Sequence, residues 1–192
     1  MLVPFLYGSR LYGLYNNHSD FDYLFITDNV ETVRTLVSPD TDVYTLSDFE
    51  IALNNSHSLK CIEVYFSNPL FFYARDIQFK LNKDTLRRSV SKVASNAYVK
   101  AKKKIRDGER YIGLKSYWHC IRILYQMCIL AEHKTYDPTK LKELSHIYLS
   151  IMSYNSYEET FKDEIFKLLD QQFYAYMNEL LHNFRLLAPK DT

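Results

Sequence analysis

Glycine, proline and cysteine are scarce in this chain of 192 residues, which contains four, five and three of them. So few turn-forming residues exclude a collagen-like chain and a Pro- and Gly-rich disordered chain. The three cysteines, Cys61, Cys120 and Cys128, are widely spaced in apolar surroundings, which favours neither a disulfide framework nor a zinc site. We therefore expect buried, reduced thiols in a cytoplasmic protein.

Long hydrophobic runs and an excess of either charge are also missing. No apolar run approaches the roughly 20 residues needed to cross a bilayer, and the N-terminus lacks the pattern of a secretory signal. The 24 Lys and Arg residues nearly balance 23 Asp and Glu residues, for a net charge of +1. We expect no membrane partner, and only local basic patches could attract nucleic acid.

Hydrophobic residues make up 47% of the chain, and their spacing changes near residue 80. Before it, short β-rich runs alternate with helical or turn segments; the runs are LVPFLY, DYLFIT, DVYTL and CIEVYF. After it, helical periodicity covers 85–106, 109–133, 138–151 and 156–187. The pattern predicts an α+β protein, with a small mixed-sheet core in residues 1–80 and a C-terminal helical bundle in residues 81–192.

A glycine turn lies in the first of these runs, FLYGSRLYGLYNNHSDFDYLFITD. The first strand is expected to end at Gly8-Ser9 and to be followed by a short helical segment. Backbone N–H groups at a helix N-terminus attract phosphate, Gly8 permits close approach, and the Ser9 hydroxyl adds a donor. The turn is therefore a candidate phosphate cradle.

Two carboxylates open the second strand of this stretch. Asp20 and Asp22 are two residues apart, so the strand pleat points both side chains to one face. Two like charges at such a spacing are costly unless a cation neutralises them, and hard oxygen ligands suit Mg²⁺ or Mn²⁺. A Gly-Ser turn alone is commonplace, and so is a lone pair of aspartates at a solvated strand start. Together they predict a nucleoside triphosphate bound with its metal ion.

At these residues the chain resembles a known family. Gly8-Ser9-Arg10-Leu11-Tyr12-Gly13, followed by Ser19-Asp20-Phe21-Asp22, is similar to the GSRxxG…SDxD signature of the DNA polymerase β-type nucleotidyltransferase superfamily. The nearest match is to the predicted nucleotidyltransferases of bacteria and phages, a group with RNA-repair-associated members. The resemblance implies a nucleotidyltransferase core that transfers an NMP from an NTP to an acceptor hydroxyl, with pyrophosphate leaving. The acceptor could be an RNA end, a protein side chain or a small molecule.

The resemblance also implies three carboxylates and two metal ions. Asp42 and Glu63 are both candidates for the third carboxylate beside Asp20 and Asp22. We favour Asp42, which opens its predicted strand, whereas Glu63 lies in the middle of the predicted strand CIEVYF. A second reading makes Glu63 a buried acid paired with a basic residue.

The helical half contains a second cluster. Lys115, His119 and Arg122 share one helical face, and WHCIRIL (118–124) looks like the His-x-Ile-Arg helix of the same group. Contact with the triphosphate would explain the cluster; a solvated basic face or a core histidine would explain it equally. Further basic residues, Arg87, Arg88, Lys92 and the run 100–106, form either a solvated face or a wall for an RNA acceptor.

Two other functions use the same residues. In the first, a degenerate nucleotidyltransferase fold binds nucleotide or a partner protein without turnover, in an antitoxin-like or regulatory role. The second is a nuclease with the same carboxylates, which we favour less because a nuclease does not need the Gly-Ser triphosphate cradle. The sequence therefore predicts a metal-dependent nucleotidyltransferase, with the binding module as the alternative.

Overall fold

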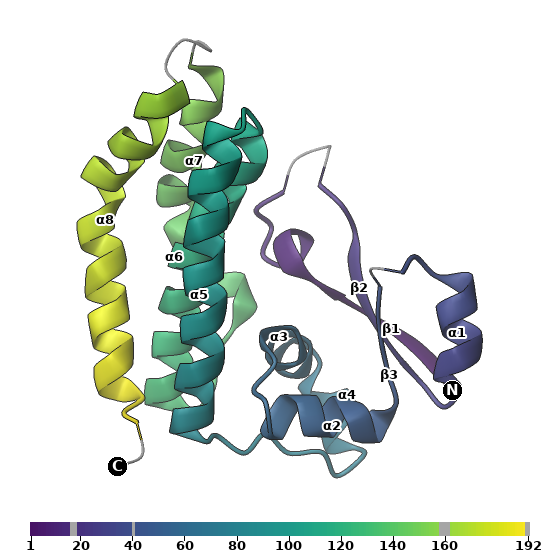
Figure 1. The fold of residues 1–192 in the computed structure, drawn as a ribbon. Helices are drawn as coiled ribbons and strands as arrows, with labels where there is room; N and C mark the ends of the chain where they lie inside the picture. Colours follow the sequence, from purple (N-terminus) through teal and green to yellow (C-terminus); the bar gives the residue numbers. More distant parts are fainter. Residues whose placement is uncertain (16–18, 40, 158–161, 191–192) are drawn as a thin grey trace.

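The computed structural model describes residues 1–15, 19–39, 41–157 and 162–190. A small sheet with short helices occupies one side of the molecule, and long helices form an elongated bundle on the other (Figure 1). Helices α5 and α6 lie between the sheet and helix α8 in this view (Figure 1). The protein is thus α+β, with a C-terminal helical region, as the sequence predicts.

Three strands form one mixed sheet in the order β1-β2-β3. Strand β1 (Leu2–Tyr7) pairs antiparallel with β2 (Asp22–Thr27), and β2 pairs parallel with β3 (Asp42–Tyr44). Phe5, Leu24 and Ile26 point to one face and are almost fully buried. The predicted strands LVPFLY and DYLFIT are confirmed, and DVYTL is shortened to its first three residues.

Four short helices follow the strands: α1 (Val30–Leu36), α2 (Leu46–Asn54), α3 (Leu59–Ser67) and α4 (Pro69–Tyr73). Polar side chains fix where two of them begin. The side chain of Asn29 accepts a hydrogen bond from the backbone of Thr32, and the Thr45 side chain accepts one from the backbone of Asp48. Such N-caps each stabilise a helix start by about 1 kcal/mol.

The predicted strand CIEVYF is wrong, because these residues belong to helix α3. Four consecutive side chains of this helix, residues 61–64, are buried. The predicted run CIEVYF is short and apolar except for Glu63, and periodicity alone cannot distinguish so short a run in a buried helix from one in a buried strand. Glu63 is therefore a helix residue and not an acid in the middle of a strand.

The helical half contains α5 (Lys83–Arg106), α6 (Arg110–His133), α7 (Ser145–Ser153) and α8 (Lys162–Leu187). The first two match their predicted ranges within two residues. The predicted helix 138–151 instead divides into the 3₁₀ helix η2 (Pro138–Leu144) and α7, and another 3₁₀ helix, η3 (Tyr154–Ser156), follows α7. Asp137 caps this 3₁₀ start through the backbone N–H of Thr139, and Pro138 fits a helix start because it lacks an N–H.

A continuous hydrophobic cluster joins the sheet to the helical half. Phe5 and Leu24 of the sheet, Leu86 of α5, Leu114 of α6 and Phe184 of α8 all belong to it. The two parts are therefore packed on shared apolar contacts. Within the part of the chain that the structure describes, none of the helices carries an apolar stretch of membrane-spanning length.

Gly113 allows α5 and α6 to approach closely. A Cβ added there would lie 2.5 Å from Ile105 Cγ1 and 3.0 Å from the Ala101 carbonyl oxygen. We expect Gly113→Ala to lower the free energy of unfolding by roughly 1–3 kcal/mol, because the helices must move apart. Urea unfolding measures this, with Ser95→Ala on the exposed side of α5 as the control. An equal or higher stability of Gly113→Ala would contradict the close packing.

Candidate active site

Tyr7, Asp22 and Asp42 come from three different strands but share one face of the sheet. Tyr7 is the pairing partner of Asp22, and Leu24 is the partner of Asp42. Paired residues point to the same face, and so do residues two apart on one strand. The C-terminal end of β1 and the starts of β2 and β3 therefore bring two of the predicted carboxylates together.

Gly8 follows directly after β1 and is adapted to the carboxylate beside it. Its φ is +76°, and a Cβ at this position would lie 2.4 Å from Asp22 Oδ2. Both observations require glycine, because an L side chain would be strained and would collide with the carboxylate. The structure thus gives Gly8 a role that the sequence did not predict: it leaves room for Asp22.

The helical segment predicted after Gly8 is only a three-residue 3₁₀ turn, Gly8–Arg10. So short a turn contributes little of the helix dipole on which the predicted phosphate cradle was based, and phosphate binding at this turn stays a prediction. The backbone N–H groups of Leu11 and Leu14 donate to the carbonyls of Gly8 and Ser9 within the same turn. The Ser9 hydroxyl oxygen is buried and has no hydrogen-bond partner among the described residues.

Arg10 holds the segment that leads into β2. Its Nη2 donates to the Ser19 carbonyl oxygen at 2.7 Å, and its Nε donates to the carbonyl oxygens of Ser19 and Asp20 at 3.2 Å. Its guanidinium also lies 3.6 Å from the ring centre of Phe21. Arg10 and Ser19, both members of the signature that the family resemblance would give a nucleotide-binding role, are therefore brought together, but through contacts that position the backbone before Asp22.

The carboxyl group of Asp22 is in an unfavourable place for a negative charge. Burial and the nearby charge of Asp20 raise its pKa, while Lys115 and Lys60 oppose the rise. A carboxylate whose charge is costly gains from a cation beside it. The sequence analysis did not single out Lys60, which directly precedes the predicted strand CIEVYF.

Asp42 already has two partners. Its Oδ2 accepts hydrogen bonds from the Tyr7 hydroxyl at 2.7 Å and from Lys60 Nζ at 2.6 Å. Tyr7 and Asp42 belong to the two outer strands, so their hydrogen bond crosses β2 on the face that carries Asp22. Burial and this bond to Asp42 raise the pKa of Tyr7, which keeps the phenol protonated as the donor.

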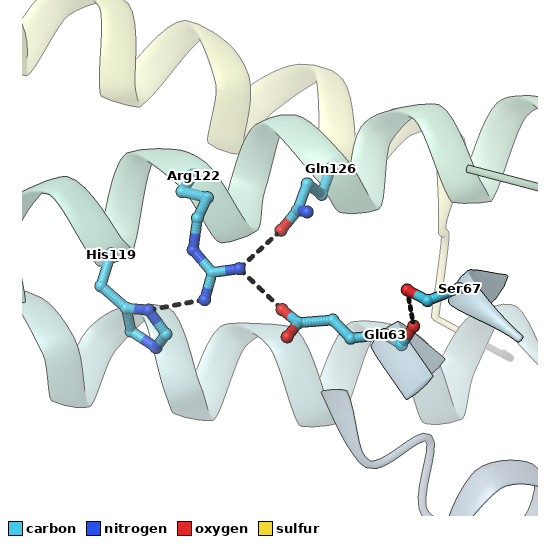
Figure 2. Close-up of polar contacts among 5 residues, drawn as sticks. All are labelled: Glu63, Ser67, His119, Arg122 and Gln126. Carbon is cyan, nitrogen blue, oxygen red and sulfur yellow. Dashed lines mark hydrogen bonds and ion pairs between the residues drawn. The ribbon is translucent and has the colours of Figure 1, made fainter. Parts of the chain in front are cut away.

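Glu63 and Arg122 form a buried ion pair between α3 and α6 (Figure 2). Arg122 Nη1 donates to Glu63 Oε1 at 2.6 Å and to Gln126 Oε1 at 3.0 Å. The guanidinium also lies 4.4 Å from the ring centre of Tyr12, in the turn after β1. The side chains of the ion pair are only 7% and 6% exposed, so both charges are withdrawn from solvent.

This pair corrects two site predictions. Glu63 fits the second reading, a buried acid paired with a basic residue, and its carboxylate binds Arg122 instead of joining a metal site. Arg122 in turn donates to Glu63, Gln126 and His119, and these donors are not free for a triphosphate. Among the described residues, no group of three His, Cys, Asp or Glu side chains is arranged to hold a metal ion.

His119 and Lys115 lie on the same helix as Arg122 but have different surroundings. Arg122 Nη2 lies 2.8 Å from His119 Nδ1. A guanidinium can only donate, so Nδ1 accepts, and the proton of the neutral ring is on Nε2. Burial and the charges of Arg122, Lys100 and Lys115 hold the pKa of His119 well below its usual range. Lys115 is the member of the predicted cluster whose charge acts on Asp22.

Comparisons with known proteins add no relative to this geometry: no family model, curated protein or solved structure matches the chain. The resemblance to the nucleotidyltransferases therefore depends on the residues between Gly8 and Asp22.

Removing Arg122 tests the buried pair. Arg122→Ala leaves the Glu63 charge buried without a partner, and we expect a loss of about 3–5 kcal/mol in the free energy of unfolding. Replacing both residues, as Glu63→Gln with Arg122→Met, removes both buried charges and should recover much of the loss. Urea unfolding of the three proteins decides: a loss below about 1 kcal/mol in Arg122→Ala would contradict the burial described.

The raised pKa of Asp22 predicts a stability change with pH. The folded protein holds the Asp22 proton more tightly than the unfolded chain does, because the pKa of Asp22 is raised on folding. Below the unfolded pKa this carboxyl therefore does not lower the free energy of unfolding. As pH rises through the folded pKa, the carboxyl lowers the free energy of unfolding. Asp22→Asn removes that cost. Relative to the wild type, the variant should gain more stability at pH 7 than at pH 4, as measured by urea unfolding. The opposite order would show that the Asp22 charge is stabilised.

Proposed function

We propose that this protein is a metal-dependent nucleotidyltransferase that transfers an NMP from an NTP to an acceptor hydroxyl. One observation carries the proposal: Asp22 and Asp42 lie on the same face of adjacent parallel strands, beside the glycine turn that the family signature predicts. Asp20 is two residues before Asp22, and the charges of Lys60 and Lys115 lower the pKa of the Asp22 carboxyl.

The residues present fit Mg²⁺ or Mn²⁺. The donors are hard carboxylate oxygens, and burial together with the charge of Asp20 raises the pKa of Asp22, so a cation beside it would reduce the cost of its negative charge. Asp20, Asp22 and Asp42 would hold the ions, but an ion would have to draw these carboxylates together, because the described residues contain no assembled group of three such ligands. Glu63 is left out of this set because it pairs with Arg122. The bound ions would lower the pKa of the attacking hydroxyl and stabilise charge on the α-phosphoryl oxygens.

The chain's own residues supply the rest of the reaction. Lys115 and the Nε2–H of His119 would bind the β- and γ-phosphates, since both lie on the helix opposite Asp22. Tyr7 would keep Asp42 in place by donating to its Oδ2. The acceptor oxygen forms a bond to the α-phosphorus, the bond to the bridging oxygen breaks, pyrophosphate leaves, and the hydroxyl proton passes to water.

A specific observation favours a second candidate, a module that binds nucleotide or a partner protein without turnover. Lys60 Nζ lies 2.6 Å from Asp42 Oδ2 and occupies the oxygen that a metal would need. If this ion pair persists when nucleotide is present, Asp42 is not a metal ligand and transfer does not occur. The binding module then remains.

Transfer of label from NTPs separates the two functions. The protein is incubated with each α-labelled NTP, Mg²⁺ or Mn²⁺, and RNA or protein extract, and the labelled product is identified. We expect transfer by the wild type, and its loss in Asp20→Asn, Asp22→Asn and Asp42→Asn, because each removes one ligand charge. Asp76→Asn, an exposed aspartate after α4, is the matched control.

A second readout does not depend on the acceptor. Mg²⁺ or Mn²⁺ with NTP should raise the melting temperature of the wild type and of Asp76→Asn more than that of Asp22→Asn. Full transfer by Asp22→Asn would rule out the metal assignment. Stabilisation by NTP without transfer to any acceptor would favour the binding module.

A further inference from the structure

Helix α5 presents an inclined row of exposed polar and basic side chains. Arg88, Lys92, Asn96 and Lys100 follow one another at intervals of four residues, so neighbours in the row adjoin on the helix surface, and the row turns by roughly 120° around the helix from its first to its last residue. Arg88 pairs with Asp84 at 2.9 Å, whereas no ion pair of Lys92 or Lys100 occurs among the described residues. Two of the charges in this row are thus available to a ligand. We call these four residues the α5 row.

A groove of about 540 Å³ lies beside the lower part of the α5 row, where the α2–α3 connection meets α5. It is lined mainly by hydroxyl, amide and basic side chains, among them Asn55, Ser56, Ser58, Ser89, Lys92 and Asn96. None of the lining residues in the described part of the chain is acidic. The Ser89 hydroxyl donates to the His57 carbonyl oxygen at 2.9 Å, which ties the two walls together.

The upper end of the α5 row leads to the candidate active site. Lys100 and Lys115 both lower the pKa of His119, and Lys115 also acts on Asp22. Positive charge therefore continues from the groove, along Lys92 and Lys100, to the cation that faces Asp22. The row from Arg88 to Lys100 covers roughly 18 Å of helix. That length corresponds to about five stacked nucleotides of one strand.

We propose that the groove and the α5 row bind the phosphodiester backbone of a single-stranded polynucleotide whose terminal hydroxyl is the acceptor. The inference rests on the proposed function and names its substrate class. Lys92 and Lys100 are two cations along the α5 row that suit phosphates of one chain, and the hydroxyl and amide groups of the groove suit phosphate and sugar oxygens. A small-molecule acceptor would use no charge so far from Asp22, and a protein acceptor would not require this spacing.

Fluorescence anisotropy tests the surface without NTP. The probes are a labelled ten-nucleotide RNA and a DNA of the same sequence, each titrated at 50 mM and 200 mM salt. We expect the double variant Lys92→Ala with Lys100→Ala to bind about tenfold more weakly at the lower salt. For this variant, the slope of log K against log salt should be shallower than that of the wild type by about 1 to 1.5, because each lost phosphate contact removes about 0.7 from that slope.

The matched control is Lys167→Ala with Arg185→Ala, which removes two exposed charges from α8, on the other side of the bundle from the sheet (Figure 1). It should bind like the wild type. Equal weakening in both double variants, or no binding of either probe at 50 mM salt, would overturn the proposal. Binding of RNA alone would support it and assign a role to the 2′-hydroxyl, whereas equal binding of both probes supports backbone recognition.

The test is separable from that of the proposed function. Asp22→Asn should bind both probes like the wild type, because it lies outside the groove and the α5 row. Transfer of label to a protein or a small molecule, without polynucleotide binding, would overturn this inference and leave the nucleotidyltransferase in place. Polynucleotide binding through the α5 row without transfer to any acceptor would overturn the transferase and leave a nucleic-acid-binding module.

Discussion

The ion pair between Glu63 and Arg122 is the interaction on which the arrangement of the site depends. Arg122 contacts Glu63 of α3, the ring of Tyr12 after β1, and His119 of its own helix. One buried guanidinium thus joins the sheet region to the helical half through three separate segments. Because a buried charge without its partner is very costly, these segments can hardly move apart independently. The distance between the carboxylates of the sheet and the cations of α6 is fixed in the same way.

Because Arg122 is paired with Glu63, other basic residues are left to contact a ligand. Of the predicted basic cluster, Lys115 keeps its charge directed at Asp22, and His119 is left with a neutral ring whose Nε2 carries the proton. Lys60, on α3, contributes the second cation. The site therefore contains two lysines, from two different helices, opposite carboxylates from two strands. Such a balance of charge is suited to a ligand that brings both metal ions and phosphates.

The sequence predicted the parts of the fold that have a clear period or a capping signal. The strands that flank Gly8 and Asp22 and the two long helices α5 and α6 were of this kind, and so was the position of Asp42 at the start of β3. Helix α3 was missed because its run CIEVYF is short and mostly apolar, and such a run reads equally well as a buried strand. The pairing of Glu63 was therefore left undecided. The contact of Arg10 with Ser19, and that of Gly8 with Asp22, depend on how two strand ends meet. No local pattern encodes such a meeting.

For the proposed function, the ion pair between Lys60 and Asp42 would have to open before Asp42 could bind a metal ion. Its two side chains are 49% and 18% exposed, and a pair so open to solvent contributes only about 0–1 kcal/mol. A divalent ion that also binds Asp20 and Asp22 interacts with several charges at once, so it has more to gain at Asp42 Oδ2 than one lysine does. Once released, Lys60 would lie at the edge of the same site with its charge free for a phosphate. In the absence of ligand, Lys60 thus balances the charge of Asp42. The same lysine also opposes the rise in the pKa of Asp22, which burial and Asp20 cause.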